Sequence, residues 1–192
     1  MAELLDRTGP TPAAQATDPE AELPAGAEIR VLEAVQQTIA TPPVVGTARA
    51  MSLFGEHAAG WLALGLLGAA VDRQRRREWL TATAGVALAH GASIGVKRVV
   101  RRRRPDHPSV QVLVGTPSRL SFPSAHATST AAAAVLYGRL LGTPLTGAVV
   151  PPMALSRLVL GVHYPSDVAV GSALGVAVAL LTGRLTRREV AR

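Results

Sequence analysis

The 192-residue chain lacks cysteine altogether and has very few aromatic side chains. Without cysteine it forms no disulfide, offers no thiolate nucleophile and cannot build a zinc-thiolate centre. Aromatic residues make up only 3% of the chain, so the stacking side chains that bind single-stranded DNA or RNA are nearly absent. The net charge of +7 therefore does not indicate a nucleic-acid partner.

Lysine and acidic side chains are also scarce. One lysine, Lys97, stands against nineteen arginines, and Asp106 and Asp167 are the only acidic residues between positions 79 and 188. Two isolated carboxylates do not form the cluster that a metal site needs, so we predict neither a metal nor another cofactor. Arginine suits lipid headgroups and phosphates, and we interpret the basic charge as membrane topology and anion binding.

The chain is rich in apolar residues, at 48% hydrophobic and 17% charged, which is typical of a single membrane-embedded domain. Several segments approach the ~20 residues that cross ~30 Å of hydrocarbon. They are residues 52–71, 79–98, 124–141, 144–162 and 166–184. We therefore predict an all-α fold, a polytopic transmembrane bundle of about five spans. The spacing of Gly91 with Gly95, and of Gly171 with Gly175, predicts close helix packing.

The segment ahead of these spans has a different composition. Residues 1–25 are rich in Ala, Pro, Thr and acidic side chains, which predicts a disordered tail. Residues 27–40 carry apolar side chains at helical spacing, and Pro42 ends that pattern, which predicts an amphipathic helix at the membrane interface. The predicted organisation is a tail and interfacial helix over 1–48, followed by a membrane domain over 49–192.

Three polar motifs fall on one side of the predicted bundle. They are KRVVRRRRP at 97–105, SFPSAH at 121–126 and SRLVLGVHYPSD at 156–167. Each has an ordinary explanation: the arginines can anchor to headgroups, Ser124 can cap a helix, and Asp167 can complement a helix dipole. Ionisable residues beside membrane segments are costly, however, and their convergence from four helix ends favours a functional site.

The charges of this site predict a phosphate ligand. Lys97, Arg104 and Arg157 supply fixed positive charge, and the planar fork of arginine matches phosphate oxygens. Ser124 and the amides at the start of the third span add a helix N-terminus, which also favours anions.

Two histidines are available for phosphoryl transfer. His163 lies one helical turn before Asp167, so the carboxylate can hold one ring nitrogen protonated and leave the other free to attack phosphorus. His126 can protonate the leaving oxygen and then activate water. The cations would stabilise the transition-state charge without a metal.

These residues are where the sequence resembles the type 2 phosphatidic acid phosphatase family, lipid phosphate phosphatases that share an active-site plan with vanadium haloperoxidases. Its motifs are KxxxxxxRP, PSGH and SRxxxxxHxxxD. They are matched by Lys97, Arg104 and Pro105, by Pro123, Ser124 and His126, and by Ser156, Arg157, His163 and Asp167. The motif resemblance covers residues 97–167.

The resemblance implies a role for each matched residue. It makes His163 the nucleophile, His126 the general acid and Asp167 the orienting group. The implied phosphate ligands are Lys97, Arg104, Ser124, Ala125 and Arg157. Ala125 stands where the family usually has glycine, and the family's membrane members often have six crossings where we predict five.

A site at headgroup level predicts an amphiphilic substrate whose tail stays in the bilayer. The candidates are polyprenyl phosphates and diphosphates, phosphatidylglycerol phosphate and phosphatidic acid. The Ala, Arg, Gly, Val and Pro bias is typical of an actinobacterial genome, which favours a cell-wall precursor such as decaprenylphosphoryl-5-phosphoribose. The predicted partners are this lipid and the bilayer, and the sequence is compatible with a monomer or an oligomer.

Positive charge predicts the orientation. Nine arginines lie on the face away from the motifs and six lie on the motif face, once Lys97, Arg104 and Arg157 are set aside. The positive-inside rule then predicts a multi-pass plasma-membrane protein with a cytoplasmic C-terminus and an extracytoplasmic active site. Two alternatives stay open: a non-catalytic protein that binds anionic lipids, and a vanadate-dependent peroxidase.

Overall fold

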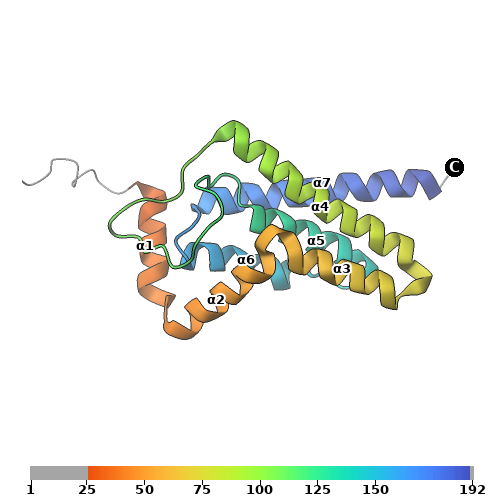
Figure 1. The fold of residues 1–192 in the computed structure, drawn as a ribbon, viewed down its shortest axis with the longest axis horizontal. Helices are drawn as coiled ribbons and strands as arrows, with labels where there is room; N and C mark the ends of the chain where they lie inside the picture. Colours follow the sequence, from red (N-terminus) through yellow and green to blue (C-terminus); the bar gives the residue numbers. More distant parts are fainter. Residues whose placement is uncertain (1–25, 191–192) are drawn as a thin grey trace, which may run out of the picture.

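The computed structural model describes residues 26–190 as a bundle of helices (Figure 1). The α-helices are α1 (Ala27–Ile39), α2 (Pro42–Gly55), α3 (Ala59–Val71), α4 (Arg76–Val100), α5 (Ala125–Leu141), α6 (Thr146–Val159) and α7 (Pro165–Val190). The 3-10 turns η2 (Glu56–Ala58) and η3 (Arg73–Arg75) join the pairs around α3. Within the described range there is no β-strand, so the all-α prediction is confirmed. The tail predicted over 1–25 lies outside the described residues.

Among the described residues, three stretches are long and apolar enough to cross a membrane: Pro42–Val71, Arg73–Val100 and Pro165–Arg184. They expose large apolar side chains, among them Leu67 at 59% and Leu88 at 62%, as expected of surfaces that face lipid. The other two predicted spans correspond to α5 and α6, which have 17 and 14 residues. The chain is thus a helical membrane protein, and the count of five spans stays a prediction.

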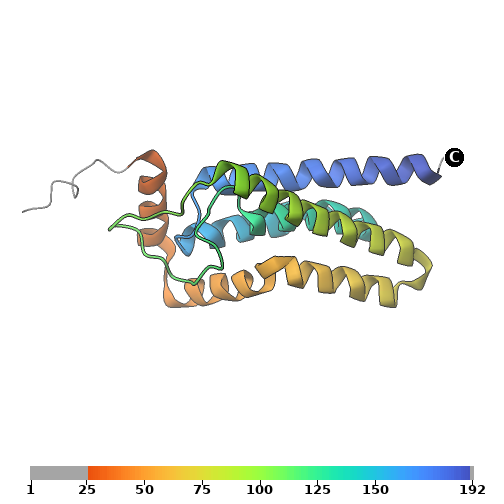
Figure 2. The same ribbon diagram turned by 45° about the horizontal axis from the view of Figure 1, so that its top comes forward.

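Helix α1 confirms the predicted N-terminal helix and lies across one end of the bundle (Figures 1 and 2). A new helix starts at Pro42 instead of the predicted residue 52, because prolines fit the first turn of a helix. This helix is interrupted at His57 and Ala58, whose φ angles of 51° and 59° lie in the left-handed region. Helices α2 and α3 are therefore two segments joined by a kink.

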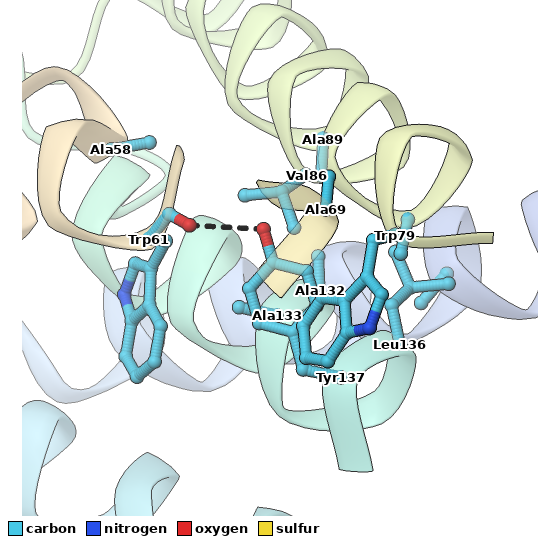
Figure 3. Close-up of a cluster of buried hydrophobic side chains, with 12 residues drawn as sticks. Ala58, Trp61, Ala69, Trp79, Val86, Ala89, Ala132, Ala133, Leu136 and Tyr137 are labelled. Atoms are coloured by element: carbon cyan, nitrogen blue, oxygen red, sulfur yellow. Dashed lines mark hydrogen bonds between the residues drawn. The ribbon is translucent and has the colours of Figure 1, made fainter. Parts of the chain in front are cut away.

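The core of the bundle lies between α3, α4, α5 and α7 (Figure 3). The Trp61 indole donates to Thr130 Oγ1 at 2.9 Å, and the Tyr137 hydroxyl donates to the Trp61 carbonyl at 2.9 Å. Trp79 packs against Tyr137 with ring centroids 5.5 Å apart. Buried aromatic side chains need partners for their polar atoms, and these two hydrogen bonds hold α3 against α5. The ring contact of Trp79 with Tyr137 holds α4 against α5.

The two glycine pairs differ in what they contact. A Cβ at Gly175 would come within 2.1 Å of the Thr128 carbonyl oxygen, and one at Gly171 within 2.7 Å of the Ser124 carbonyl oxygen. These glycines let α7 approach the backbone of α5, as predicted. A Cβ at Gly91 or Gly95 would meet nothing within 4 Å, so that pair makes no close helix contact inside the described chain.

The polar segments gather at the end of the bundle that α1 crosses. The loop between α4 and α5 and the short connection from α6 to α7 both lie there (Figures 1 and 2). The Ser121 N–H donates to the Arg102 carbonyl at 2.7 Å, and the Ser124 N–H donates to the Asp167 carbonyl at 2.9 Å. The backbone bonds therefore hold the three motifs in one layer.

Candidate active site

A cavity of about 430 Å³ opens at this end of the bundle. It is lined by residues from every predicted motif: Lys97, Arg104, Ala125, His126, Arg157 and His163. The other two predicted site residues, Ser124 and Asp167, are fully buried and are not part of the lining. The structure thus brings together side chains from α4, α5, α6 and the intervening loops.

His163 directs its two ring nitrogens to groups of opposite charge. Its Nε2 lies 3.2 Å from Arg104 Nη1, and its Nδ1 lies 3.4 Å from Asp167 Oδ2. The ring is 2% exposed. Burial, together with the positive charges of Arg104 and Lys97, lowers the pKa of His163 to about 4 although Asp167 opposes the shift. The neutral ring therefore keeps the Nε2 lone pair at the cavity wall.

Asp167 sits behind His163 in the first turn of α7 and is 0% exposed. Its Oδ2 accepts the Tyr164 backbone N–H at 2.8 Å, and its Oδ1 accepts from Arg102 Nη1 at 3.1 Å. Both carboxylate oxygens are thereby fixed. Oδ2 lies 3.4 Å from His163 Nδ1, within ion-pair distance, and Nδ1 has no hydrogen-bond partner of its own among the described residues. Asp167 is therefore the group placed to orient the imidazole.

His126 lies on the first turn of α5 and contacts α2. Its Nε2 lies 2.9 Å from the Ser52 carbonyl oxygen. A carbonyl can only accept, so Nε2 carries the proton and Nδ1 is the nitrogen left to exchange one. A Cβ at Gly55 would come within 2.5 Å of His126 Cδ2, so a glycine there leaves room for the ring.

Lys97 and Arg157 are buried, Arg104 is half-buried, and all three cations are bonded to neutral oxygens. Lys97 Nζ donates to the Leu120 carbonyl at 3.0 Å, and Arg104 donates to the Ser118 and Val162 carbonyls. Arg157, 1% exposed, donates to Ser52 Oγ at 3.0 Å. Burial lowers the pKa of Arg104 to about 10.

None of these cations has a carboxylate within 4.0 Å among the described residues. Burying a charge without a counter-ion is unfavourable, so three such charges around one cavity indicate an anionic ligand. Across the same part of the chain, no group of three or more His, Asp or Glu side chains is arranged to hold a metal ion.

Ser124 caps α5, and Ala125 begins it. The Ser124 hydroxyl accepts the Ala127 N–H at 3.5 Å, and the Ser124 N–H donates to the Asp167 carbonyl. The structure therefore gives Ser124 an N-cap role, and its predicted contact with phosphate stays a prediction. Ala125 lines the cavity in right-handed helical backbone, where a methyl group costs no strain.

Sequence reasoning missed several residues around the cavity. Arg49, His57, His90 and Arg98 also line it. His57 and His90 carried a signal, because both are ionisable residues within apolar stretches. Arg49 and Arg98 lie beside apolar segments, where topology alone explains a positive charge. Nothing in the local sequence indicates the contacts of Ser52, which come from across the fold.

The sequence is similar to those of known phosphatases. The family model described as the PAP2 superfamily matches residues 78–190. The decaprenylphosphoryl-5-phosphoribose phosphatase of Mycobacterium tuberculosis H37Rv is 60% identical over 152 residues, which cover 79% of this chain and 86% of that protein. The protein of the same name from Mycolicibacterium smegmatis is 61% identical over 145 residues, covering 75% and 81%.

Solved membrane phosphatases share the fold. A PAP2-type phosphatidylglycerolphosphate phosphatase from Bacillus subtilis superposes with a TM-score of 0.67 at 21% identity, covering 85% of this chain and 88% of that one. LpxE from Aquifex aeolicus also superposes with a TM-score of 0.67, at 17% identity, covering 81% and 94%.

Proposed function

The chain belongs to the PAP2 superfamily and is a membrane phosphatase, and we propose that it hydrolyses the 5-phosphate of decaprenylphosphoryl-5-phosphoribose. The observation that carries the proposal is the set of three cations without carboxylate partners that line one cavity with His163, with Arg104 next to its Nε2. Such a cavity favours a phosphate over a neutral ligand. The high identity to relatives that bear this enzyme's name supports the choice of lipid.

In the first proposed step, the Nε2 lone pair of His163 attacks phosphorus. A P–N bond forms as the P–O bond to the ribose C5 oxygen breaks. Protonated His126 donates a proton from Nδ1 to that leaving oxygen, which departs as the alcohol. Lys97, Arg104 and Arg157 stabilise the charge on the phosphoryl oxygens.

In the second proposed step, water cleaves the phosphohistidine. His126, now neutral, accepts a proton from the water as the oxygen attacks phosphorus. The P–N bond breaks, its electrons return to Nε2 of His163, and inorganic phosphate leaves. Asp167 holds the Nδ1 side of the ring through both steps, so the same tautomer is regenerated.

The substrate has a second phosphate, the diester between ribose and the prenyl chain. Arg49 and Arg98 add positive charge to the cavity wall beyond the three motif cations, and both are exposed. We propose that this outer charge favours lipids with two phosphates over lipids with one.

The membrane arrangement is part of the proposal. We propose five spans, with α5 and α6 completing the three long apolar stretches, and an active site on the outer face of the plasma membrane. Residues 49–192 would form the phosphatase domain, and residues 1–48 the tail and interfacial helix. Helix α2, Pro42–Gly55, runs across that boundary.

Phosphate release by the purified protein in detergent tests the function. The substrates to compare are decaprenylphosphoryl-5-phosphoribose, phosphatidylglycerol phosphate, phosphatidic acid and a polyprenyl diphosphate, each with and without EDTA or vanadate. We expect release that EDTA leaves unchanged and vanadate inhibits. His163→Ala should lose about 10³-fold or more of the activity, whereas His107→Ala should keep it, since His107 lies outside the cavity lining.

Other outcomes would identify the alternatives. A folded protein that binds anionic lipid but releases no phosphate from any of these lipids would be a non-catalytic binder. Halide oxidation with added vanadate and peroxide would indicate a peroxidase. Activity that EDTA abolishes would contradict the histidine mechanism.

A further inference from the structure

Arg102 differs from its neighbours in the arginine run of residues 101–104. Its Nη1 donates to Asp167 Oδ1 at 3.1 Å and to Ser166 Oγ at 2.7 Å. Its guanidinium also stacks over the Tyr164 ring, 3.8 Å from the centroid. Arg102 does not line the cavity, so its charge acts on the first turn of α7 and not on a ligand.

Glu28 binds the second terminal nitrogen of the Arg102 guanidinium. Its Oε2 accepts from Arg102 Nη2 at 2.5 Å, and its Oε1 accepts the Ser166 backbone N–H at 3.0 Å. The two oxygens of one carboxylate therefore bind both the arginine and the N-terminus of α7, where a negative charge is favourable. Glu28 belongs to α1 and lies outside the segment that the family model matches.

We propose that Glu28 and Arg102 are positioning residues that hold Asp167, and through it His163, in the geometry for phosphoryl transfer. The proposal rests on the phosphatase function proposed above. Arg102 occupies Oδ1 of Asp167, while Oδ2 accepts the Tyr164 N–H and lies 3.4 Å from Nδ1 of His163. Glu28 fixes the guanidinium in that orientation, as second partners of functional histidines commonly do.

The electrostatics of the pair agree with this role. Burial would raise the pKa of Glu28, but hydrogen bonds from Ser166 and Arg102 outweigh burial and lower it. Burial likewise disfavours the charged form of Arg102, yet Glu28 and Asp167 raise its pKa overall. Both groups are therefore charged across the physiological range.

Helix α1 is anchored firmly enough to serve as a support. Leu32 is fully buried and Ile29 is 9% exposed, both in a cluster with Val110 of the motif loop. Gln36 donates to the Gln111 and Val159 carbonyls and accepts the Gln111 N–H at 2.9 Å. The helix thus binds the α4–α5 loop and the end of α6 independently of Glu28.

The positioning role predicts a change in proton affinity as well as in rate. Charged groups act on His163 from three packed elements, Asp167 of α7, Arg104 of the loop and Lys97 of α4, and the titratable His126 of α5 lines the same cavity. Removing the positive charge of Arg102 makes Asp167 a stronger partner for protonated His163. The protonation of His163 should then move to higher pH by on the order of one unit.

The experiment compares Arg102→Ala with Arg103→Ala, which removes a neighbouring exposed arginine. The full-length protein in detergent is assayed for phosphate release between pH 4 and 8, and the kcat/KM of each variant is divided by that of the wild type so that substrate ionisation cancels. We expect Arg102→Ala to lower kcat roughly 10–100-fold with little change in KM. The ratio of its kcat/KM to that of the wild type should fall further at acid pH. Arg103→Ala should stay at the wild-type ratio throughout.

Further variants separate positioning from a loss of folding. Arg102→Lys keeps the positive charge but lacks the planar guanidinium, and it should recover part of kcat and the wild-type pH dependence. Glu28→Gln should lower kcat in the wild type but have little further effect in Arg102→Ala, because both act through one contact. A pH-independent ratio for Arg102→Ala, or additive losses in the double variant, would overturn the proposal. A wild type that releases no phosphate would instead refute the proposed function.

Discussion

At the scale of single residues, the two nitrogens of His163 decide when the ring can act as a nucleophile. Burial and the charges of Arg104 and Lys97 favour the neutral ring, and Asp167 alone favours the protonated one. The lowered pKa, about 4, means that Nε2 keeps its lone pair at pH 5 to 7 and loses it as the pH falls through about 4.

We therefore predict that His163 stays neutral at pH 5.5 in the free protein. The measurement is a ¹⁵N NMR titration of histidine-labelled protein in detergent, which is practical because the chain has only five histidines. The signal of His163 is identified by its loss in His163→Gln. A midpoint for His163 near the ordinary 6.5 would contradict the prediction.

Gly55 allows a second prediction at this scale. A methyl group in Gly55→Ala would overlap His126 Cδ2, and the ring can move more easily than the backbone. We expect a loss of kcat on the order of 10-fold or more, since an acid displaced by about 1 Å transfers its proton poorly, with little change in thermal stability. Gly46→Ala on the same helix is the control, because its Cβ would meet nothing within 4 Å. Equal activities of the two variants would show that the position of His126 does not depend on Gly55.

The sequence could predict the residues of the site but not their supports. His126, His163 and Asp167 stand at fixed spacings within short motifs, so local pattern identifies them. Glu28 reaches Ser166 across 138 positions of the chain, and His126 reaches Ser52 across 74. Such contacts depend on how helices pack, and no local spacing encodes them.

At the scale of helices, the contact between α5 and α7 depends on small residues. Gly175→Ala would drive a Cβ into the Thr128 carbonyl oxygen, which is backbone and cannot rotate away. We predict a loss of about 1–3 kcal/mol of stability from this overpacking, seen as a lower Tm in detergent by a thermal-shift assay. Gly91→Ala is the matched control on an open helix face and should keep or slightly raise the Tm, since alanine favours helix. A Tm of Gly175→Ala as high as that of Gly91→Ala would show that α5 and α7 are not in close contact.

Element boundaries were predicted best where composition changes sharply. Helix α1 ends shortly before Pro42, α4 ends directly before the arginine run that starts at Arg101, and α5 ends directly before Gly142. The kink at His57 and Ala58 was not predicted, because neither position holds a glycine or proline and alanine rarely adopts left-handed backbone. The break lies at the end of α2, which packs against α5 and α6.

At the scale of the whole molecule, the positive charges at the two ends of the bundle have different roles. At the cavity end, Lys97, Arg104 and Arg157 are buried or half-buried in the cavity lining and cannot serve as topology signals. At the opposite end, the α3–α4 turn carries Arg73 and Arg75, both exposed. The positive-inside rule therefore applies to the second end and predicts that it faces the cytoplasm.

The absence of cysteine makes this orientation directly testable. A single cysteine at Ser109, exposed in the α4–α5 loop, should react with a membrane-impermeant maleimide added to intact cells. One at Gln74, exposed in the α3–α4 turn, should react only after the membrane is permeabilised. The cysteine-free parent controls for background labelling, and phosphate release by each variant shows that the fold is kept. The reverse labelling pattern would put the cavity on the cytoplasmic face, so that the substrate would have to be hydrolysed before it crosses the membrane.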